Sequence, residues 1–319
     1  MALKVVITDY EYPDIDAEKR IIGDAGHVLK DYQAKSEDEL IAATHDADAV
    51  IVQYANFTRK VIQKLEHCKM IIKYGIGVNN IDAEAATERG IWVCNVPDYG
   101  LDEVSAHAAA LLLSLARKLP QADKALKAGM WGNASFRPIT RLAGSTLGIA
   151  GFGALGRLVA KKMSGFELEI IAFDPFLDAA KAKELGVEAV DFAGLCKRSD
   201  FISVHCPLTK ETARMFNRDA FNAMKNSAYF VNTSRGGVVD EAALAEALLA
   251  GEIAGAGLDV YETEPLAADS PLLKMPNVIT TGHVAWYSEQ AITTLQRKVA
   301  EEVVNVLAGN KPFNPCNRI

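Results

Sequence analysis

The chain has 319 residues, of which 50% are hydrophobic, and a formal net charge of −7 from 34 basic and 41 acidic side chains. This length suits two domains with sizeable cores, and the acidic balance argues against a nucleic-acid or anionic-membrane partner. The five cysteines form no C-x-x-C pair and no zinc-like spacing. We therefore expect reduced thiols, a cytoplasmic protein and no bound metal.

The first hundred residues alternate between short β-branched runs and helical patterns. The opening stretch, MALKVVITDY, reads as a strand and lacks the longer apolar segment and cleavage site of a signal peptide. Helical patterns such as residues 36–47 and 82–90 separate the runs. The predicted strands are residues 4–8, 49–54, 70–75 and 91–96. This alternation predicts a parallel sheet with helices on both faces.

A change of pattern near residue 100 marks a second unit. A long helix is expected at about residues 103–128, and its most apolar part, residues 106–116, is too short to span a bilayer. The strands expected after it are residues 145–152, 168–174, 201–206, 228–234, 253–260 and 277–282. A final amphipathic helix at residues 288–308 is predicted to return to the first domain. The fold class is therefore α/β, with two doubly wound parallel-sheet domains.

A glycine-rich turn follows the first strand of the second unit. Gly151, Gly153 and Gly156 have the spacing G-x-G-x-x-G, between an apolar strand and a helix. In dinucleotide-binding proteins the first glycine permits a tight turn, the second admits the pyrophosphate, and the third lets the helix pack closely. The alternative is a glycine-rich turn without a ligand.

Asp174 ends the next strand, 174 − 156 = 18 residues beyond the last glycine. That interval fits the acid that binds the ribose hydroxyls of NAD, and no arginine follows to receive the 2′-phosphate of NADP. The sequence therefore predicts NAD as the cofactor. An alternative role for Asp174 is to cap a turn.

Three polar residues follow later strands of the same unit: Arg235, Glu264 and His283. The carboxyl ends of parallel strands meet at one edge of a sheet, so these side chains are predicted to converge. Arginine binds carboxylates through paired donors, histidine exchanges a proton at a carbonyl, and glutamate stabilises an imidazolium. Taken singly, they could instead be a surface ion pair, a turn carboxylate and a structural histidine.

The order of these motifs resembles the D-isomer-specific 2-hydroxyacid dehydrogenases over almost the whole chain. The segments that carry the resemblance are GFGALGR, VHCPLT, NTSRGG, GLDVYETEP and GHVAW. The segments KYGIGVNNID and NVPDYGLDEVSAHAAALLLSLAR are similar to the branch near the C-terminal-binding-protein corepressors and the phosphoglycerate dehydrogenase-like members.

The resemblance implies roles for individual residues. His283 is the expected acid/base, Glu264 its partner, and Arg235 the residue that holds the substrate. Substrate-binding residues are expected at Tyr54, Tyr74, Gly75, Ile76 and Gly77. Cofactor-binding residues are expected at Gly151, Gly153, Ala154, Leu155, Gly156, Asp174, Pro175, His205, Cys206, Pro207, Thr212, Thr233, Ser234 and Asp259.

The resemblance also implies a division of the chain. Residues 1–100 plus 287–319 would form a flavodoxin-like substrate domain, and residues 101–286 a Rossmann NAD-binding domain. Family members are commonly homodimers, and residues 129–133 (GMWGN) resemble part of that interface. The chain ends soon after the last helix, so we expect no carboxy-terminal regulatory domain.

Two positions depart from the family pattern. Gly282 stands where proline usually precedes the histidine, so a less constrained backbone is expected at His283. Ala106 stands where an acid commonly precedes His107, and His107 is expected to serve packing.

The expected function is NAD-dependent interconversion of a D-2-hydroxy acid and a 2-oxo acid. The alternative is an NAD(H)-responsive, corepressor-like binding protein that retains the dehydrogenase site. The sequence also lacks an arginine at Gln53 and Tyr54, where phosphoglycerate dehydrogenases typically bind the phosphate. A substrate with a small uncharged or hydroxyl-bearing side chain, rather than a phosphorylated one, is therefore expected.

Overall fold

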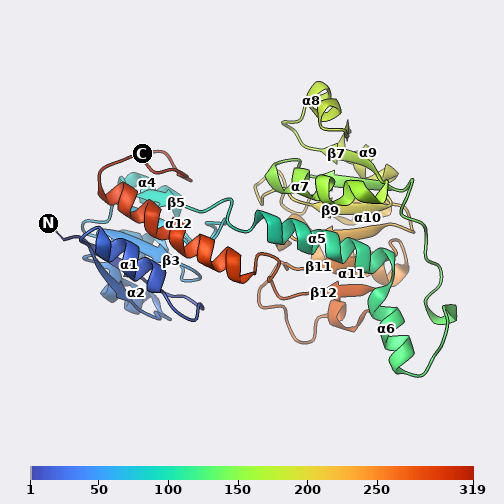
Figure 1. Ribbon diagram of the computed structural model, residues 1–319, viewed down its shortest axis with the longest axis horizontal. Helices are drawn as coiled ribbons and strands as arrows, with labels where there is room; N and C mark the ends of the chain where they lie inside the picture. Colours follow the sequence, from blue (N-terminus) through green and yellow to red (C-terminus); the bar gives the residue numbers. More distant parts are fainter. Residues whose placement is uncertain (1) are drawn as a thin grey trace. The chain divides into compact units, whose positions relative to one another are not determined.

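The computed structural model describes residues 2–319, which form two compact units (Figure 1). The first unit comprises the residues up to Gly100 together with Ser288–Ile319, and the second comprises Leu101–Tyr287. The division predicted from the sequence places the second boundary one residue earlier. Each unit is a parallel sheet covered by helices, as the alternating pattern predicts.

The first unit has a five-stranded parallel sheet in the order β2-β1-β3-β4-β5, the flavodoxin-like order. Its strands are β1 (Lys4–Ile7), β2 (Val28–Asp31), β3 (Ala49–Val52), β4 (Met70–Lys73) and β5 (Trp92–Cys94). Its helices are α1 (Asp16–Asp24), α2 (Glu37–Thr44), α3 (Arg59–Ile62), α4 (Ala83–Glu88) and α12 (Glu289–Leu307). Helix α12 packs against α1, so the end of the chain completes this unit.

Burial explains which strands the sequence revealed. Every residue of β3 is buried, and such a strand reads as an apolar run. Strand β2 lies at the edge of the sheet, where Val28 is 46% exposed. Without an apolar run, β2 gave no signal in the sequence. The two-residue strand β8 of the second unit, Glu188–Ala189, was missed for the same reason.

The second unit has a seven-stranded parallel sheet in the order β12-β11-β10-β9-β6-β7-β8. Its strands besides β8 are β6 (Thr146–Ala150), β7 (Glu169–Phe173), β9 (Phe201–Val204), β10 (Tyr229–Asn232), β11 (Gly255–Leu258) and β12 (Val278–Thr280). The chain starts in the middle with β6, runs outward to β8, and then returns to build the other half from β9. This is the Rossmann arrangement, with its switch point between β6 and β9.

Helices cover both faces of this sheet. One core joins the strands to α5 (Leu101–Ala116) and α7 (Ala154–Met163). The other core joins them to α9 (Phe192–Arg198), α10 (Arg218–Asn222) and α11 (Glu241–Ala250). The remaining helices are α6 (Leu119–Lys127) and α8 (Ala179–Glu184), with short 3-10 turns at Ala134–Phe136, Ser164–Phe166, Gly236–Val238 and Pro271–Lys274.

The single long helix expected at residues 103–128 is in fact two helices, α5 and α6. Lys118 between them adopts a left-handed backbone with φ +50°, and Pro120 lies in the first turn of α6. Proline lacks the N–H that a continuous helix needs and disfavours helical geometry in the residue before it. The apolar pattern ran through this break and concealed it. Among residues 2–319, no helix is long and apolar enough to cross a membrane.

Candidate active site

The loops that follow the strands of the second unit carry most of the residues predicted to be functional. Strands β6 and β9 are neighbours, although the sheet is built outward from them in opposite directions. Such a switch point is where open α/β sheets bind ligands. The glycine turn follows β6, and the loop containing His205 and Cys206 follows β9, so the structure brings these two predicted segments together.

The glycine turn is shaped by close backbone contacts. Gly151 has φ +89°, and a Cβ atom built on it would lie 2.6 Å from the backbone nitrogen of Cys206. A Cβ on Gly156 would lie 2.2 Å from the Gly151 carbonyl oxygen and 3.1 Å from Ile149 Cγ2 of β6. Only glycine fits at either position. The tight turn and the close helix–strand packing predicted for these two glycines are both present.

Gly153 differs from the other two glycines because its surroundings are open. A Cβ atom there would have no neighbour within 4 Å, and the residue stands as the N-cap of α7 without a side chain to cap the helix. Ala154 and Leu155 begin the helix. The first N–H groups of α7 therefore have no side-chain cap at the N-cap position, which is the arrangement that binds an anionic pyrophosphate. The residues present fit a dinucleotide.

Asp174 follows β7 and is half-buried. Its Oδ2 accepts a hydrogen bond from Phe152 N at 2.8 Å, and its Oδ1 accepts one from Phe176 N at 2.9 Å. The carboxylate thus caps its own turn and also ties the end of β7 to the glycine turn. Each oxygen has a second lone pair, so capping leaves room for ribose hydroxyl donors. Pro175, next in the chain, is exposed.

Buried polar atoms without partners lie at the ends of β9 and β10. His205 Nε2 lies 2.8 Å from Ser203 Oγ, whereas its Nδ1 has no hydrogen-bond partner, and neither does Thr233 Oγ1. Burial lowers the pKa of His205 to about 4, so its ring is neutral at physiological pH. Unpaired buried polar atoms are costly unless a ligand or water engages them, which again fits a bound cofactor.

The remaining predicted residues of these loops are held by local hydrogen bonds. Thr212 Oγ1 donates to the Pro207 carbonyl at 2.6 Å, which closes the loop after β9. Ser234 N and Oγ both donate to Asn232 Oδ1, at 3.0 and 2.9 Å. Asn232 in turn donates to the Arg235 carbonyl at 3.0 Å. The side chain of Asn232 therefore folds the loop that presents Arg235.

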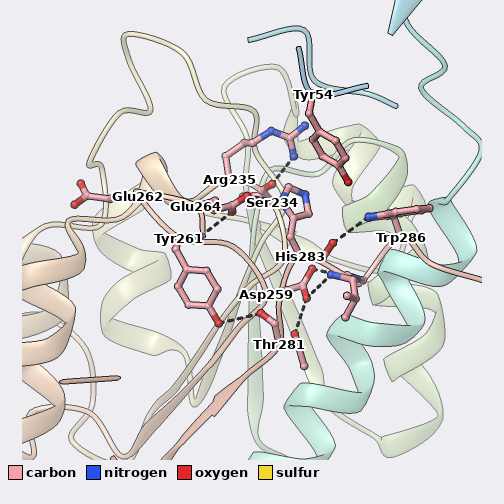
Figure 2. A network of polar contacts seen from close by, with 12 residues as sticks. Tyr54, Ser234, Arg235, Asp259, Tyr261, Glu262, Glu264, Thr281, His283 and Trp286 are labelled. Carbon is pink, nitrogen blue, oxygen red and sulfur yellow. Dashed lines mark hydrogen bonds and ion pairs between the residues drawn. The ribbon is translucent and has the colours of Figure 1, made fainter. Parts of the chain in front are cut away.

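His283 and Glu264 form a direct pair (Figure 2). His283 Nδ1 lies 2.6 Å from Glu264 Oε2, and Tyr261 N donates to Glu264 Oε1 at 3.0 Å. Burial alone would raise the pKa of Glu264, but the hydrogen bond and charge of His283, with the charge of Arg235, hold it below its usual value. Because an ionised carboxylate can only accept, Nδ1 carries a proton, and Nε2 is left to exchange a proton with a substrate.

Arg235 is placed next to this pair by an unusually close backbone contact. A Cβ atom on Gly236 would lie 1.9 Å from the carbonyl carbon of Tyr261. Only a glycine after Arg235 lets the loop that follows β10 press against the loop that follows β11. Arg235 Nη1 donates to the Ser234 carbonyl at 2.6 Å. The three residues predicted to converge thus lie in loops that contact one another (Figure 2).

The backbone of His283 is more constrained than the glycine before it led us to expect. It has φ +56°, a left-handed conformation that costs a non-glycine residue about 1 kcal/mol. His283 N donates to the Asp259 carbonyl at 2.8 Å, and Trp286 Nε1 donates to the His283 carbonyl at 3.0 Å. Hydrogen bonds from the fold therefore supply the restraint that a proline supplies in the usual family pattern.

Asp259, predicted to bind the cofactor, also holds the histidine loop. Its carboxylate is 1% exposed and accepts from Val284 N at 3.0 Å and Ala285 N at 2.9 Å. Thr281 Oγ1 donates to the same carboxylate at 2.5 Å. Three donors to one buried carboxylate make a strong local clamp.

Within the first unit, Tyr54 follows β3 on a loop fixed by a buried acid. Tyr54 is 56% exposed, whereas Asp9 is 8% exposed. Asp9 Oδ2 accepts from Tyr54 N at 2.5 Å and from Ala55 N at 3.1 Å. Gln53 is 3% exposed, and its Oε1 accepts from Glu11 N at 2.9 Å, so its side chain is committed to the fold.

Tyr74 begins the predicted substrate loop after β4, but its ring points into the core. It is 4% exposed, and its hydroxyl donates to the buried carboxylate of Glu18 at 2.5 Å. Burial raises the pKa of Glu18. Gly75 follows with φ +137°, and Gly75, Ile76 and Gly77 continue the loop. Gly75 N donates to the Lys73 carbonyl at 2.9 Å, so it is already engaged. The backbone amides of Ile76 and Gly77, rather than the phenol of Tyr74, are the groups of this segment suited to an anionic ligand.

Sequence reasoning missed the residues that support the site, among them Asp9, Glu18, Asn232 and Trp286. Each acts through a partner distant in the chain or through the backbone, and a motif carries no sign of such a partner. Gly236 was missed as well, although the repeated glycine of NTSRGG is a signal of a close backbone approach that could have revealed it.

Comparison with known proteins agrees with this geometry. The family described as D-isomer specific 2-hydroxyacid dehydrogenase, NAD binding domain, matches residues 109–285, more than half of the chain. The chain belongs to this family. The matched segment contains the glycine turn, Asp174 and all three polar residues, so the second unit carries the NAD-binding domain of these dehydrogenases.

Individual relatives are enzymes by name. D-3-phosphoglycerate dehydrogenase of Archaeoglobus fulgidus is 43% identical over 88% of this chain and 54% of its own length. The glyoxylate reductase of Korarchaeum cryptofilum is 38% identical over 91% of this chain and 88% of its own. The chain therefore spans about half the length of the phosphoglycerate dehydrogenase and most of the length of the glyoxylate reductase.

A solved structure resembles the chain over nearly all of its length. It is a D-lactate dehydrogenase from Aquifex aeolicus complexed with NAD and lactic acid. Its TM-score is 0.86 at 29% identity, with 96% of each chain covered. None of the proteins named here is a corepressor, so these comparisons give the corepressor-like alternative no support.

Proposed function

We propose that this protein is an NAD-dependent oxidoreductase that interconverts a D-2-hydroxy acid and a 2-oxo acid. The observation that carries the proposal is the contact of 2.6 Å between His283 Nδ1 and Glu264 Oε2. The pair lies beside the loop that carries Arg235, at the same edge of the sheet as the glycine turn. This arrangement supports proton transfer coupled to hydride transfer at a carbonyl.

Each residue has a separate role in the proposed reaction. A bound NADH supplies the hydride that reaches the carbonyl carbon. His283 in its imidazolium form gives its Nε2 proton to the carbonyl oxygen, so the 2-oxo acid becomes a 2-hydroxy acid. Glu264 stabilises the imidazolium and orients the ring, and Arg235 binds the substrate carboxylate through paired N–H donors. In the reverse direction neutral Nε2 accepts the hydroxyl proton.

The preference for NAD over NADP rests on Asp174. Its carboxylate, at the end of β7, would accept the ribose hydroxyls and repel a 2′-phosphate. The test is the ratio of kcat/KM with NADH to that with NADPH. A ratio of one or less would show that Asp174 does not select the cofactor.

The backbone amides of Ile76 and Gly77, in the first unit, are proposed to bind the substrate carboxylate, with Tyr54 in the same unit. We infer that the substrate is small and not phosphorylated. Gln53 lies in the stretch where an arginine would bind the phosphate, and it is buried and hydrogen-bonded to Glu11 N, so this stretch supplies no cation. A phosphate without a bidentate cation would lose hydration for little compensation. Within the first unit, Lys73 Nζ lies 5.5 Å from the centroid of the Tyr54 ring.

The deciding experiment is NADH oxidation with a panel of 2-oxo acids at equal concentration. Glyoxylate, pyruvate and hydroxypyruvate should be reduced, and 3-phosphohydroxypyruvate should be a poor substrate. A preference for the phosphorylated compound would refute the substrate inference but leave the dehydrogenase proposal intact. No turnover with any 2-oxo acid, although NADH binds, would refute the dehydrogenase proposal itself.

We also propose a cytoplasmic homodimer. The helix α6 and the residues just after it expose apolar side chains: Leu119 54%, Leu126 57%, Met130 49% and Trp131 91%. A surface of this kind suits a second copy of the chain, and five free cysteines suit a reducing compartment. Light scattering after size exclusion should give twice the chain mass, and Trp131→Glu should give the monomer. A wild-type monomer would refute the dimer.

A further inference from the structure

The histidine loop, residues 281–285, is fixed from two sides. The carboxylate of Asp259 accepts two backbone N–H groups of the loop, from Val284 and Ala285. On the other side, Trp286 Nε1 donates to the His283 carbonyl. Because His283 has a left-handed backbone conformation, its position depends on these contacts. Whatever holds Asp259 therefore also determines where the imidazole of His283 lies.

Helix α5 reaches Asp259 through a hydroxyl group. His107 Nε2 lies 3.0 Å from Thr281 Oγ1, and Thr281 Oγ1 lies 2.5 Å from Asp259 Oδ1. The same His107 nitrogen lies 3.8 Å from Asp259 Oδ1. His107 was expected to serve packing, but it ends a chain of three polar groups instead.

The number of available hydrogens determines which group donates in each of these hydrogen bonds. The Asp259 carboxylate accepts from two backbone amides and, at 2.5 Å, from the Thr281 hydroxyl, so the hydroxyl hydrogen is committed to it. Thr281 Oγ1 can then only accept from His107, and His107 Nε2 must carry a proton. The order is His107 Nε2–H to Thr281 Oγ1–H to Asp259.

The burial of Asp259 shows why its hydrogen bonds to Thr281 and, through it, to His107 matter. Asp259 is 1% exposed, and the side chain of His107 is 24% exposed. A buried carboxylate is stable only with enough donors, and the Thr281 hydroxyl is its side-chain donor. His107 polarises that hydroxyl from the solvent side and holds it in place.

We propose that His107 and Thr281 are positioning residues for the proton-transferring His283, and that they act through the carboxylate of Asp259. This inference rests on the proposed dehydrogenase function for its kinetic test, but the position of the loop can also be measured without turnover.

A set of variants distinguishes the contribution of the Thr281 hydroxyl from that of the His107 imidazole, and both from the effect of packing. Thr281→Val keeps the shape and removes the hydroxyl, whereas Thr281→Ser keeps the hydroxyl. His107→Leu removes the donor, whereas His107→Gln retains an N–H donor of similar reach. Ser114→Ala is the matched control, because Ser114 lies two turns further along α5 and is likewise half-buried.

We expect Thr281→Val and His107→Leu to lower kcat about tenfold to a hundredfold, the scale for a misplaced reacting group. The KM for the 2-oxo acid and the NADH dissociation constant should change far less. Thr281→Ser and His107→Gln should each retain more of kcat than their apolar counterparts, and Ser114→Ala should match the wild type. Unchanged kcat in both apolar variants would overturn the proposal.

Hydrogen exchange of the Val284 and Ala285 amides, measured with NADH bound, provides the second readout. Both amides should exchange faster in Thr281→Val and His107→Leu than in the wild type and in Ser114→Ala. Wild-type exchange rates would overturn the positioning role even if no 2-oxo acid is turned over, an outcome that would separately refute the proposed function. If Thr281→Val does not fold, the two His107 variants decide the question.

Discussion

The glycine turn after β6 and the histidine loop after β12 lie at the same edge of one sheet, yet they are built in different ways. The turn is shaped by the absence of side chains, because a Cβ on Gly151 or Gly156 would meet backbone atoms at 2.6 or 2.2 Å. The loop is shaped by side chains outside it: Asp259 and Glu264 after β11, and Trp286, the next residue in the chain. The glycine turn depends on close approaches between backbones, whereas the proton-transfer site depends on hydrogen bonds from side chains.

This difference predicts how each region fails. A substitution in the glycine turn should damage folding and cofactor binding together, because backbone atoms collide. A substitution in the histidine loop should damage turnover while the fold and cofactor binding persist. The following predictions test this separation, in order of decreasing expected effect.

Replacing His283 by alanine should lower kcat about 10²–10⁴-fold, because the reaction loses its positioned proton donor. The NADH dissociation constant, measured by fluorescence titration, should change little. His67→Ala is a suitable control, since the His67 side chain is 69% exposed and its Nε2 lies 3.7 Å from Oε2 of the exposed Glu66. Near-normal turnover by His283→Ala on the best substrate would remove His283 from the mechanism.

Two single-methyl changes in the glycine turn should differ in their effect on stability. Gly156→Ala should lower the free energy of unfolding by about 1–3 kcal/mol, as overpacking does, and should weaken NADH binding. Gly153→Ala has open space and an extended backbone, so it should preserve stability but still weaken NADH binding. Thermal unfolding and NADH titration of both variants check this contrast. Equal stability of the two variants would contradict the backbone account of the turn.

Glu264→Gln should lower kcat about tenfold, because the charge-assisted bond to His283 becomes a neutral one, a loss of about 1.4 kcal/mol. The pKa of Glu264 lies below its usual value, so the wild-type carboxylate is ionised throughout the neutral range. Because this charge stabilises the imidazolium that gives its proton to the 2-oxo acid, the deficit of the variant in reduction should widen as the pH rises. The measurement is kcat from pH 6 to 8. A variant with wild-type kcat would mean that the charge of Glu264 contributes nothing to turnover.

His205 should make the glycine-turn region sensitive to acid. The unfolded chain binds a proton on this histidine near pH 6.5, whereas burial lowers the pKa in the folded protein to about 4. The unfolded state therefore binds more protons between these values, and stability should fall as the pH drops from 6.5 to 4. The slope is at most about 1.4 kcal/mol per pH unit. In a comparison of melting temperatures, His205→Gln should lose less stability over this window, and a parallel loss would contradict the assignment.

The same contrast explains how far the sequence could be read. The glycine turn, the order of strands and the convergence of Arg235, Glu264 and His283 follow from local patterns and from the rule that parallel strands end together. The left-handed conformation of His283 does not follow, because it depends on Asp259 and Trp286. Nor does the inward orientation of Tyr74, because its partner Glu18 belongs to helix α1, more than fifty residues earlier. The break at Lys118 was foreshadowed only by Pro120, inside an otherwise continuous apolar pattern.

The contact between Gly236 and Tyr261 has a consequence for anyone who wishes to alter this protein. No side-chain atom fits between the two backbones, so the segments 232–240 and 257–265 pack directly against each other there. A loop transplanted from a relative into either segment alone would arrive with a surface shaped for a different neighbour. Engineering a new substrate preference should therefore exchange both segments together, and libraries that vary one of them should leave Gly236 untouched.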